Sequence, residues 1–184
     1  MDEWIEGLRE QLNEPWAPVA PWAAALPVAF LLLVVLGRTE DGWMPFLDGI
    51  NLVFHEAGHP VFGILGWETL TILGGTLMQL LVPLLLGGSF WLKRQPLGVA
   101  LCGQWAGQNL LNISRYMADA RAQQLPLVGG GEHDWGELLF RWDLLRKDQI
   151  LAGRVAALGW LLMLVGAAWL TFRAWRDRSG AGSA

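Results

Sequence analysis

The sequence predicts an all-α fold, a multi-pass membrane helix bundle of about five spans with amphipathic helices at the membrane interface. Two observations predict this fold. Hydrophobic residues make up 53% of the 184 residues and charged residues only 16%, against about 25% charged in a typical soluble domain. The chain also has 12 tryptophans and one tyrosine, and tryptophan favours the level of the lipid headgroups because its ring is apolar and its N–H is polar.

Five apolar segments are each close to the roughly 20 residues that cross the hydrocarbon core of a bilayer. The first and the last are almost wholly apolar, as expected of spans that face lipid. The other three carry polar residues at regular spacing, so we expect them to face one another. Five spans would place the two termini on opposite faces of the membrane. The segments cover residues 21–37, 46–66, 70–92, 96–117 and 150–172.

The rest of the chain extends this arrangement into one membrane domain. The acidic N-terminus has apolar residues on one helical face, and a second amphipathic helix is predicted over 134–148, with Leu138, Leu139, Trp142 and Leu145 on its apolar side. The domain covers 1–184: an N-terminal amphipathic helix over 1–15, four spans with the predicted metal site over 21–117, a loop and interfacial helix over 118–149, the last span over 150–172, and a weakly held tail over 173–184.

Charge and cysteine content exclude several classes of protein. The net charge of −4 and the absence of a basic patch interleaved with aromatic residues argue against a nucleic-acid partner. The single cysteine, Cys102, permits no internal disulfide and no Cys-x-x-Cys metal site. The acidic start lacks the basic residues of a signal peptide. The sequence therefore predicts an integral, multi-pass protein of the bacterial cytoplasmic (inner) membrane, with membrane lipid as its first partner.

The second apolar segment contains the sequence His-Glu-Ala-Gly-His at 55–59. Residues four apart lie on one face of a helix, so His55 and His59 can bind one zinc ion. Glu56 can then act as general base on a water held by that metal. The alternative is that both histidines are core residues bonded to an asparagine or to the backbone. Ionisable groups are expensive in a bilayer and usually functional there, which favours the metal.

Two of the predicted spans carry a continuous polar stripe. Residues spaced three or four apart fall on one side of a helix; on the fourth segment they lie within an arc of about 80°. Neither stripe can face lipid, so the two should face each other. The alternative is that they only supply hydrogen bonds between helices. One stripe consists of Asp48, Asn51, His55 and His59, and the other of Gln104, Gln108, Asn112, Arg115 and Asp119.

A catalytic zinc site normally has three protein ligands and one open position. The candidates for the third ligand are Asp119, His133 and, more weakly, Asp134. His133 follows three glycines that could fold it back into the bundle, but it could equally belong to a helix start that Asp134 caps. If the two spans end level, His55 lies about 9 Å deeper than Asp119. The loop must then dip into the bundle, or the second span must sit higher.

Gln79 is a polar residue in the middle of the third apolar segment. It could bond the water of the metal site, a histidine ring or a substrate, or it could join two helices. We place it with Gln108, Asn112, Arg115 and Asp134 among the polar residues that support the site.

These residues resemble the site-2-protease-type intramembrane zinc metalloproteases. The features that carry the resemblance are "HEAGH" in a membrane helix, the following "ILGGT", and a later membrane helix with an aspartate, all within residues 45–120. The resemblance implies His55 and His59 as ligands of one zinc ion, Glu56 as the base, and hydrolysis of peptide bonds near or within the bilayer.

The chain departs from that family in two places. The family's third ligand is an aspartate in an Asn-Pro-x-Asp-Gly or Leu-Asp-Gly context on a later span. No such motif follows the histidines here, and Asp119 in "MADAR" is the nearest substitute. In addition, Pro60 removes the N–H that would bond the Glu56 carbonyl, so it should kink the helix beside the metal.

The sequence thus predicts an intramembrane zinc metallopeptidase acting on membrane-protein substrates. The alternative is a non-proteolytic metal-binding or accessory subunit that packs against partner membrane proteins in a larger complex. A metal-dependent hydrolase of lipids or other small amphiphiles is a third option.

Overall fold

The computed structural model describes residues 2–128 and 131–181, and these residues form helices and loops with no strand. The predicted all-α fold is therefore confirmed. The elements are α1 (Asp2–Asn13), the 3₁₀ helix η1 (Pro21–Ala24), α2 (Ala25–Gly37), α3 (Leu47–Gly63), α4 (Glu68–Leu92), α5 (Pro96–Ala118), α6 (Asp134–Arg141), the 3₁₀ helix η2 (Leu145–Lys147) and α7 (Asp148–Ala181).

Two helices of the described chain are long and apolar enough to cross a membrane. They are α4 and the stretch Leu145–Ser179, which comprises η2 and most of α7. The first apolar segment, Pro21–Gly37, is helical but shorter than a span requires. Of the five predicted spans, helix length and composition support the third and the fifth. The other three fall short because α2 is short, α3 has only 17 residues, and α5 carries the polar stripe.

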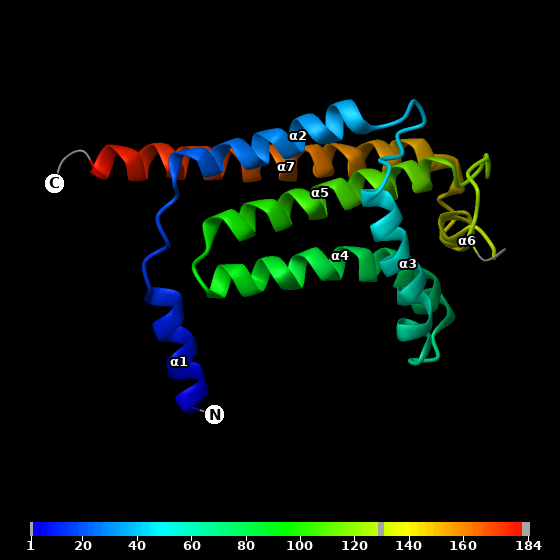
Figure 1. The fold of residues 1–184 in the computed structure, drawn as a ribbon. Helices are drawn as coiled ribbons and strands as arrows, with labels where there is room; N and C mark the ends of the chain where they lie inside the picture. The colour runs from blue at the N-terminus through cyan, green and yellow to red at the C-terminus, as the bar shows by residue number, and fades with distance from the viewer. Residues whose placement is uncertain (1, 129–130, 182–184) are drawn as a thin grey trace.

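The helices α2, α4, α5 and α7 run lengthwise beside one another, and α3 crosses them near one end (Figure 1). The central helix is α5, which packs on α7 along one side and on α4 along the other, while α2 lies along α7 and α3 packs mainly on α4. The helix α1 projects from the end of the bundle opposite to α3. The crossing of α3 sets the position of the histidine motif at that end of the bundle.

Glycines allow the closest helix contacts. A Cβ atom on Gly58 would lie 2.1 Å from the carbonyl oxygen of Gly74, so α3 and α4 touch through their backbones. In the same way, a Cβ atom on Gly159 of α7 would lie 2.6 Å from the carbonyl oxygen of Gly107 of α5. Small residues permit this approach between helices that carry few charges.

The two ends of the chain meet at the end of the bundle away from α3. The backbone N–H of Val19 donates to Asp177 Oδ2 at 2.9 Å, and the N–H of Ala17 donates to the carbonyl of Arg94 at 2.9 Å. The expectation that the termini lie on opposite faces assumed that all five apolar segments run end to end, whereas α3 crosses the bundle and only α4 and α7 are long and apolar enough to span.

The segment after α5 also differs from the predicted single helix over 134–148. The helix α6 ends at Arg141, the chain turns through Asp143 with a φ of 56°, and α7 begins at Asp148. Leu138 and Leu139 are completely buried against α5 and α7, so α6 packs on the bundle as well as facing outward.

Two further expectations concern the helix ends. The tail predicted over 173–184 is helical as far as Ala181, and its last three residues, 182–184, lie outside the described residues. Pro60 lies inside α3, which continues for three more residues to Gly63.

Candidate metal centre

His55 and His59 of α3 meet Asp134, the first residue of α6. The Nε2 atom of His55 lies 2.9 Å from Asp134 Oδ2, and the Nε2 atom of His59 lies 3.4 Å from the same oxygen. One ligand atom from each residue lies within 4.8 Å of the others. Bonds of about 2.0–2.2 Å in a tetrahedral site place ligand atoms about 3.4 Å apart, so this group could hold a metal ion.

His59 gives a specific reason to expect a cation in this group. Its Nδ1 atom lies 3.0 Å from the carbonyl oxygen of Thr71, so the Nδ1–H must donate to that oxygen. A neutral His59 ring then has only a lone pair on Nε2, and this lone pair faces the Asp134 carboxylate. Two acceptors face each other unless a proton or a metal ion lies between them. Metal-binding histidines commonly donate their other N–H to a carbonyl in this way.

The ring of His55 occupies the space that a side chain at Gly75 of α4 would fill. A Cβ atom at Gly75 would lie 2.6 Å from the Cε1 and Nε2 atoms of the ring. His55 is 8% exposed, so α4 covers it and fixes its direction. The two glycines Gly74 and Gly75 therefore have separate tasks: the first admits the backbone of α3, and the second admits the His55 ring.

Asp134 is half-buried, and the two histidines stabilise its negative charge. Burial opposes its ionisation, but the hydrogen bonds with His55 and His59 outweigh this and hold the pKa of the carboxyl below its usual range. The site therefore offers an ionised carboxylate, the form that binds a metal ion.

The loop before α6 brings Asp134 back to the histidines. Its first turn is fixed, because both oxygens of the Asp119 carboxylate accept backbone N–H groups of the loop, from Gln124 and Leu125, each at 2.9 Å. At the far end, the N–H of Asp134 donates to the Tyr116 hydroxyl at 3.1 Å. The loop thus folds back towards the bundle, as the difference in depth between His55 and Asp119 requires.

His133 caps α6. Its Nδ1 atom accepts the N–H of Gly136 at 3.0 Å, and its ring lies on the Tyr116 ring with centroids 4.1 Å apart. Because Nδ1 accepts, the proton of the neutral ring lies on Nε2, which is buried and lies 3.5 Å from Asp119 Oδ2. Burial lowers the pKa of His133 below its usual value. We expected the third ligand at Asp119, at His133 or, more weakly, at Asp134, with Asp134 otherwise the cap; in the structure His133 supplies the cap beside Asp119, and Asp134 joins the histidines.

The two polar stripes meet where α3 crosses α5, as expected. Asn51 donates to Gln108 Oε1 at 2.7 Å, and Gln108 donates to Asp48 Oδ1. The other oxygen of Asp48 accepts the N–H of Met44 at 2.7 Å. These buried amides orient α3 against α5 and lie on the side of α3 that leads to His55.

The remaining residues of the α5 stripe have separate partners. Gln104 donates to the carbonyl oxygens of Pro27 and Met163, at 2.9 and 3.3 Å. Arg115 pairs with Asp41 in the loop between α2 and α3. Arg115 lines the same cavity as the histidines, whereas Gln104 does not.

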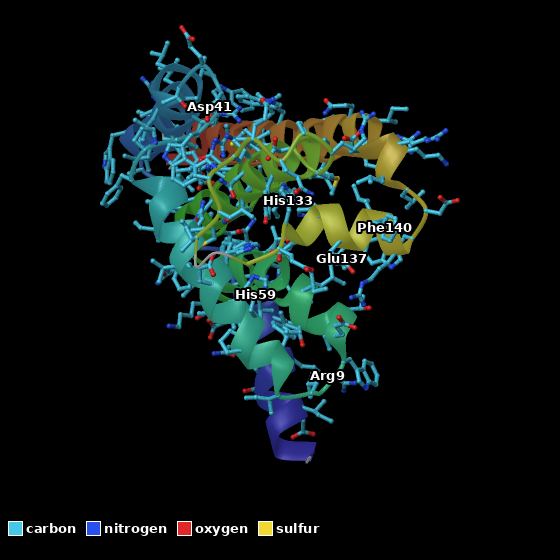
Figure 2. The ribbon with its side chains drawn as sticks, turned by 90° about the vertical axis from the view of Figure 1, so that its right-hand side faces the viewer. Arg9, Asp41, His59, His133, Glu137 and Phe140 are labelled. Atoms are coloured by element: carbon cyan, nitrogen blue, oxygen red, sulfur yellow. The ribbon has the colours of Figure 1, made fainter. Side chains whose placement is uncertain are left out.

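A cavity of about 840 Å³ opens beside the three candidate ligands. Glu56 lines it together with Gln79 of α4 and Asn112 of α5, so the predicted base and two of the predicted supporting amides share one space with the histidines. Figure 2 views the molecule from this side, with His59 on α3, His133 before α6 and Asp41 in the loop above them. The loop residues Leu125, Pro126, Leu127 and Val128 form an apolar wall of the cavity.

Three residues of the site were not identified from the sequence. Thr71 contributes through its backbone carbonyl, which no side-chain pattern reveals. Gly75 contributes by its missing side chain. Tyr116 could have been noticed, because it is the only tyrosine of the chain and neighbours the polar stripe.

Comparison of the chain with protein-family models, with curated proteins and with solved structures gave no significant match.

Proposed function

We propose that this chain is an intramembrane zinc metallopeptidase, similar to the site-2-protease-type family, that hydrolyses peptide bonds near or within the bilayer. One observation carries the proposal: His55, His59 and Asp134 converge on one point beside Glu56, in a cavity large enough for a segment of polypeptide. Two histidines and one carboxylate, with an open fourth position, form the usual donor set of a catalytic zinc ion.

The residues that line the cavity can each take a different role in peptide hydrolysis. Zinc, when bound, would polarise a substrate carbonyl and lower the pKa of a coordinated water towards 7. Glu56, next to His55 and facing the cavity, would take the proton of that water and pass it to the leaving amine. Gln79 and Asn112 would donate hydrogen bonds to the peptide, since amide N–H groups can stabilise charge on a carbonyl oxygen.

The membrane setting of this proposal extends beyond the two helices that are long enough to span. We infer a multi-pass protein of a bacterial inner membrane in which α2 and α5 accompany α4 and α7 through the bilayer. The exposed faces of α2 and α7 support this, because large apolar side chains cover them, among them Leu32, Leu36, Leu161 and Val165. Soluble proteins rarely expose such continuous apolar surface.

The test separates metal binding from catalysis. Purified chain in proteoliposomes is mixed with a library of single-span model peptides, and cleavage and zinc per chain are measured on the same preparation. We expect Glu56→Gln to keep one zinc ion and to lose cleavage by a factor of at least 10³, because the base is lost and the ligands remain. Asp134→Ala should lose zinc and cleavage together.

Full activity in Glu56→Gln would contradict the assigned base. Zinc binding by the wild type with no cleavage of any peptide, together with a stoichiometric membrane partner on purification, would favour a non-proteolytic subunit. Absence of zinc from the wild type after metal loading would remove the proposed centre altogether. Glu132→Gln serves as the matched control, since it removes an exposed carboxylate of the same cavity that lies outside the group of three ligands.

A further inference from the structure

A second cluster of functional side chains lies at the end of the bundle opposite to the metal centre. Arg94, in the turn between α4 and α5, and Arg173, on α7, both approach the ring of Trp16. Their guanidinium carbons lie 5.1 and 5.5 Å from the ring centroid. Both arginines are buried, with 9% and 7% of their surface exposed. Two buried cations at one aromatic ring are unusual unless an anion accompanies them.

The protein supplies little negative charge to this cluster. The Nε atom of Arg173 is buried without a hydrogen-bond partner in the described chain. Its nearest carboxylate oxygen, on Asp177, is 3.9 Å from the guanidinium. Asp177 also accepts the Val19 N–H at 2.9 Å and lies 3.5 Å from Arg176. One carboxylate is therefore shared by two arginines.

Among the residues that the structure describes, Arg94 has only a neutral acceptor, because its Nε–H donates to the carbonyl oxygen of Gln11 at 3.2 Å. Glu10 and Glu14 of the N-terminal segment are exposed, and the ion pairs found among the described residues do not join them to Arg94 or Arg173. The exposed Lys93 lies next to Arg94 in the chain and adds a further positive charge at the rim.

Aromatic residues place this cluster at the level of lipid headgroups. Trp91 and Trp169 contact the Trp16 ring edge-on, with centroids 4.9 and 5.5 Å apart from it. Trp91 and Trp175 expose 47% and 65% of their surface. Tryptophan gathers at the membrane interface, and both helices that are long enough to span, α4 and α7, end here (Figure 1).

We propose that Arg94, Arg173 and Trp16, with Lys93 and Arg176 at the rim, bind the phosphate headgroup of an anionic phospholipid. A guanidinium presents paired N–H groups that match two phosphate oxygens. The acyl chains would lie along the exposed apolar side chains of α4 and α7, such as Leu92 and Phe172. This site is separate from the metal centre, and it requires neither zinc nor hydrolysis.

The experiment uses the full-length protein in a neutral detergent, titrated with phosphatidylglycerol, with phosphatidylcholine of the same acyl chains, or with inorganic phosphate. Native mass spectrometry counts bound lipid, and the shift of the thermal unfolding midpoint reports all three ligands. We expect stoichiometric binding of phosphatidylglycerol, and at least tenfold weaker binding in Arg173→Gln. Arg178→Gln is the matched control, because it removes an exposed charge at the same end of the bundle outside the cluster.

Equal weakening by Arg173→Gln and Arg178→Gln would overturn the proposal, since attraction by diffuse charge would then suffice. Equal binding of the two lipids would overturn the requirement for an anionic headgroup. An equally large shift with inorganic phosphate would identify a site for free phosphate, with no role for lipid. If Arg173→Gln does not fold, Lys93→Gln with Arg176→Gln tests the rim without disturbing buried packing. The zinc content per chain is measured on each preparation. It shows whether the metal centre is intact, so a loss of lipid binding can be distinguished from a loss of metal.

Discussion

His133 links the loop that carries Asp134 to the body of the protein. Its ring caps α6 through Gly136, lies on Tyr116 and points its second nitrogen at Asp119. Each of these contacts restricts the start of α6, where Asp134 begins the helix. His133 therefore positions a candidate ligand without lying in the group of ligands itself.

Burial of His133 makes the stability of the protein depend on pH. Its pKa is lowered from the usual 6.5 by burial, so the unfolded chain binds a proton more readily than the folded chain. The stability is then fully present above about pH 6.5 and falls as the pH drops below it. We expect His133→Asn, which can still cap α6, to show a smaller fall in the unfolding midpoint between about pH 7 and pH 5.

The measurement is thermal unfolding of metal-free protein in detergent, so that the charges of His55 and His59 change alike in both proteins. Identical pH dependence of wild type and His133→Asn would refute the assignment. His133→Ala should unfold at a lower temperature than His133→Asn at every pH, because loss of a helix cap costs about 0.5–2 kcal/mol.

Single residues of the site could be predicted where local geometry decides. His55 and His59 follow from a spacing of four on one helix. Asp134 was the weakest of three candidate ligands, because its position depends on the path of a loop after α5. That path is set in part by the hydrogen bonds that the backbone N–H groups of Gln124 and Leu125 donate to Asp119, which no periodic pattern encodes. For the same reason, His133, expected as a ligand or as part of a helix start capped by Asp134, itself supplies the cap, and Asp134 joins the histidines.

At the scale of helices, the crossing of α3 and α4 determines whether the motif histidines reach the site. The two backbones touch at Gly58 and Gly74, one residue before His59 and one residue before the glycine that admits His55. Any separation of these helices would move both rings away from Asp134.

We expect Gly58→Ala to destabilise the protein by about 1–3 kcal/mol, as overpacked helix contacts do, and to lower zinc content. The new Cβ atom would lie 2.1 Å from a backbone oxygen that no side-chain rotation can move. Thermal unfolding and zinc per chain are the readouts. Gly49→Ala is the control on the same helix, because its Cβ atom meets nothing within 4 Å and alanine favours helices. Equal behaviour of the two variants would show that the crossing tolerates separation.

The limits of the helices were largely predictable, and their directions were not. The predicted segments 21–37, 70–92 and 96–117 end within one residue of the last residues of α2, α4 and α5, and the segment 150–172 begins two residues after the first residue of α7. Hydrophobic runs and flanking Gly or Pro mark such helix ends. Hydropathy reports how long and how apolar a helix is. The direction of α3 instead depends on close glycine contacts and on the amides of Asn51 and Gln108. These contacts join two different helices, so the hydropathy of a single helix does not reveal them.

For the whole molecule, the transverse course of α3 bears on the proposed membrane topology. The contact of Val19 with Asp177 places the segment before α2 and the end of α7 at one end of the bundle. The candidate metal centre lies at the other end (Figure 1). With α2, α4, α5 and α7 all spanning, as we propose, the chain termini and the candidate centre would lie near opposite faces of the membrane.

This topology can be tested by labelling single cysteines with a membrane-impermeant maleimide in a Cys102→Ala background. We expect Glu14→Cys and Ser179→Cys to react from the same side of sealed vesicles, and Ala122→Cys to react from the other. Each of the three positions is exposed. Labelling of Glu14→Cys and Ser179→Cys from opposite sides would restore a five-span arrangement. Vesicles of inverted orientation provide the control, because all three results should reverse.

The contact between His55 and Asp134 joins residues 79 positions apart in the chain. A ribosome adds about 5–20 residues per second, so the histidines are made several seconds before their carboxylate partner. During that interval α3 offers two of the three proposed ligands, which would hold a metal ion only weakly. The proposed centre can be completed only after α6 has been synthesised and folded back. In the function we propose, newly made chains would thus acquire metal as a late step of biogenesis, and hydrolytic chemistry would remain absent from the nascent protein until then.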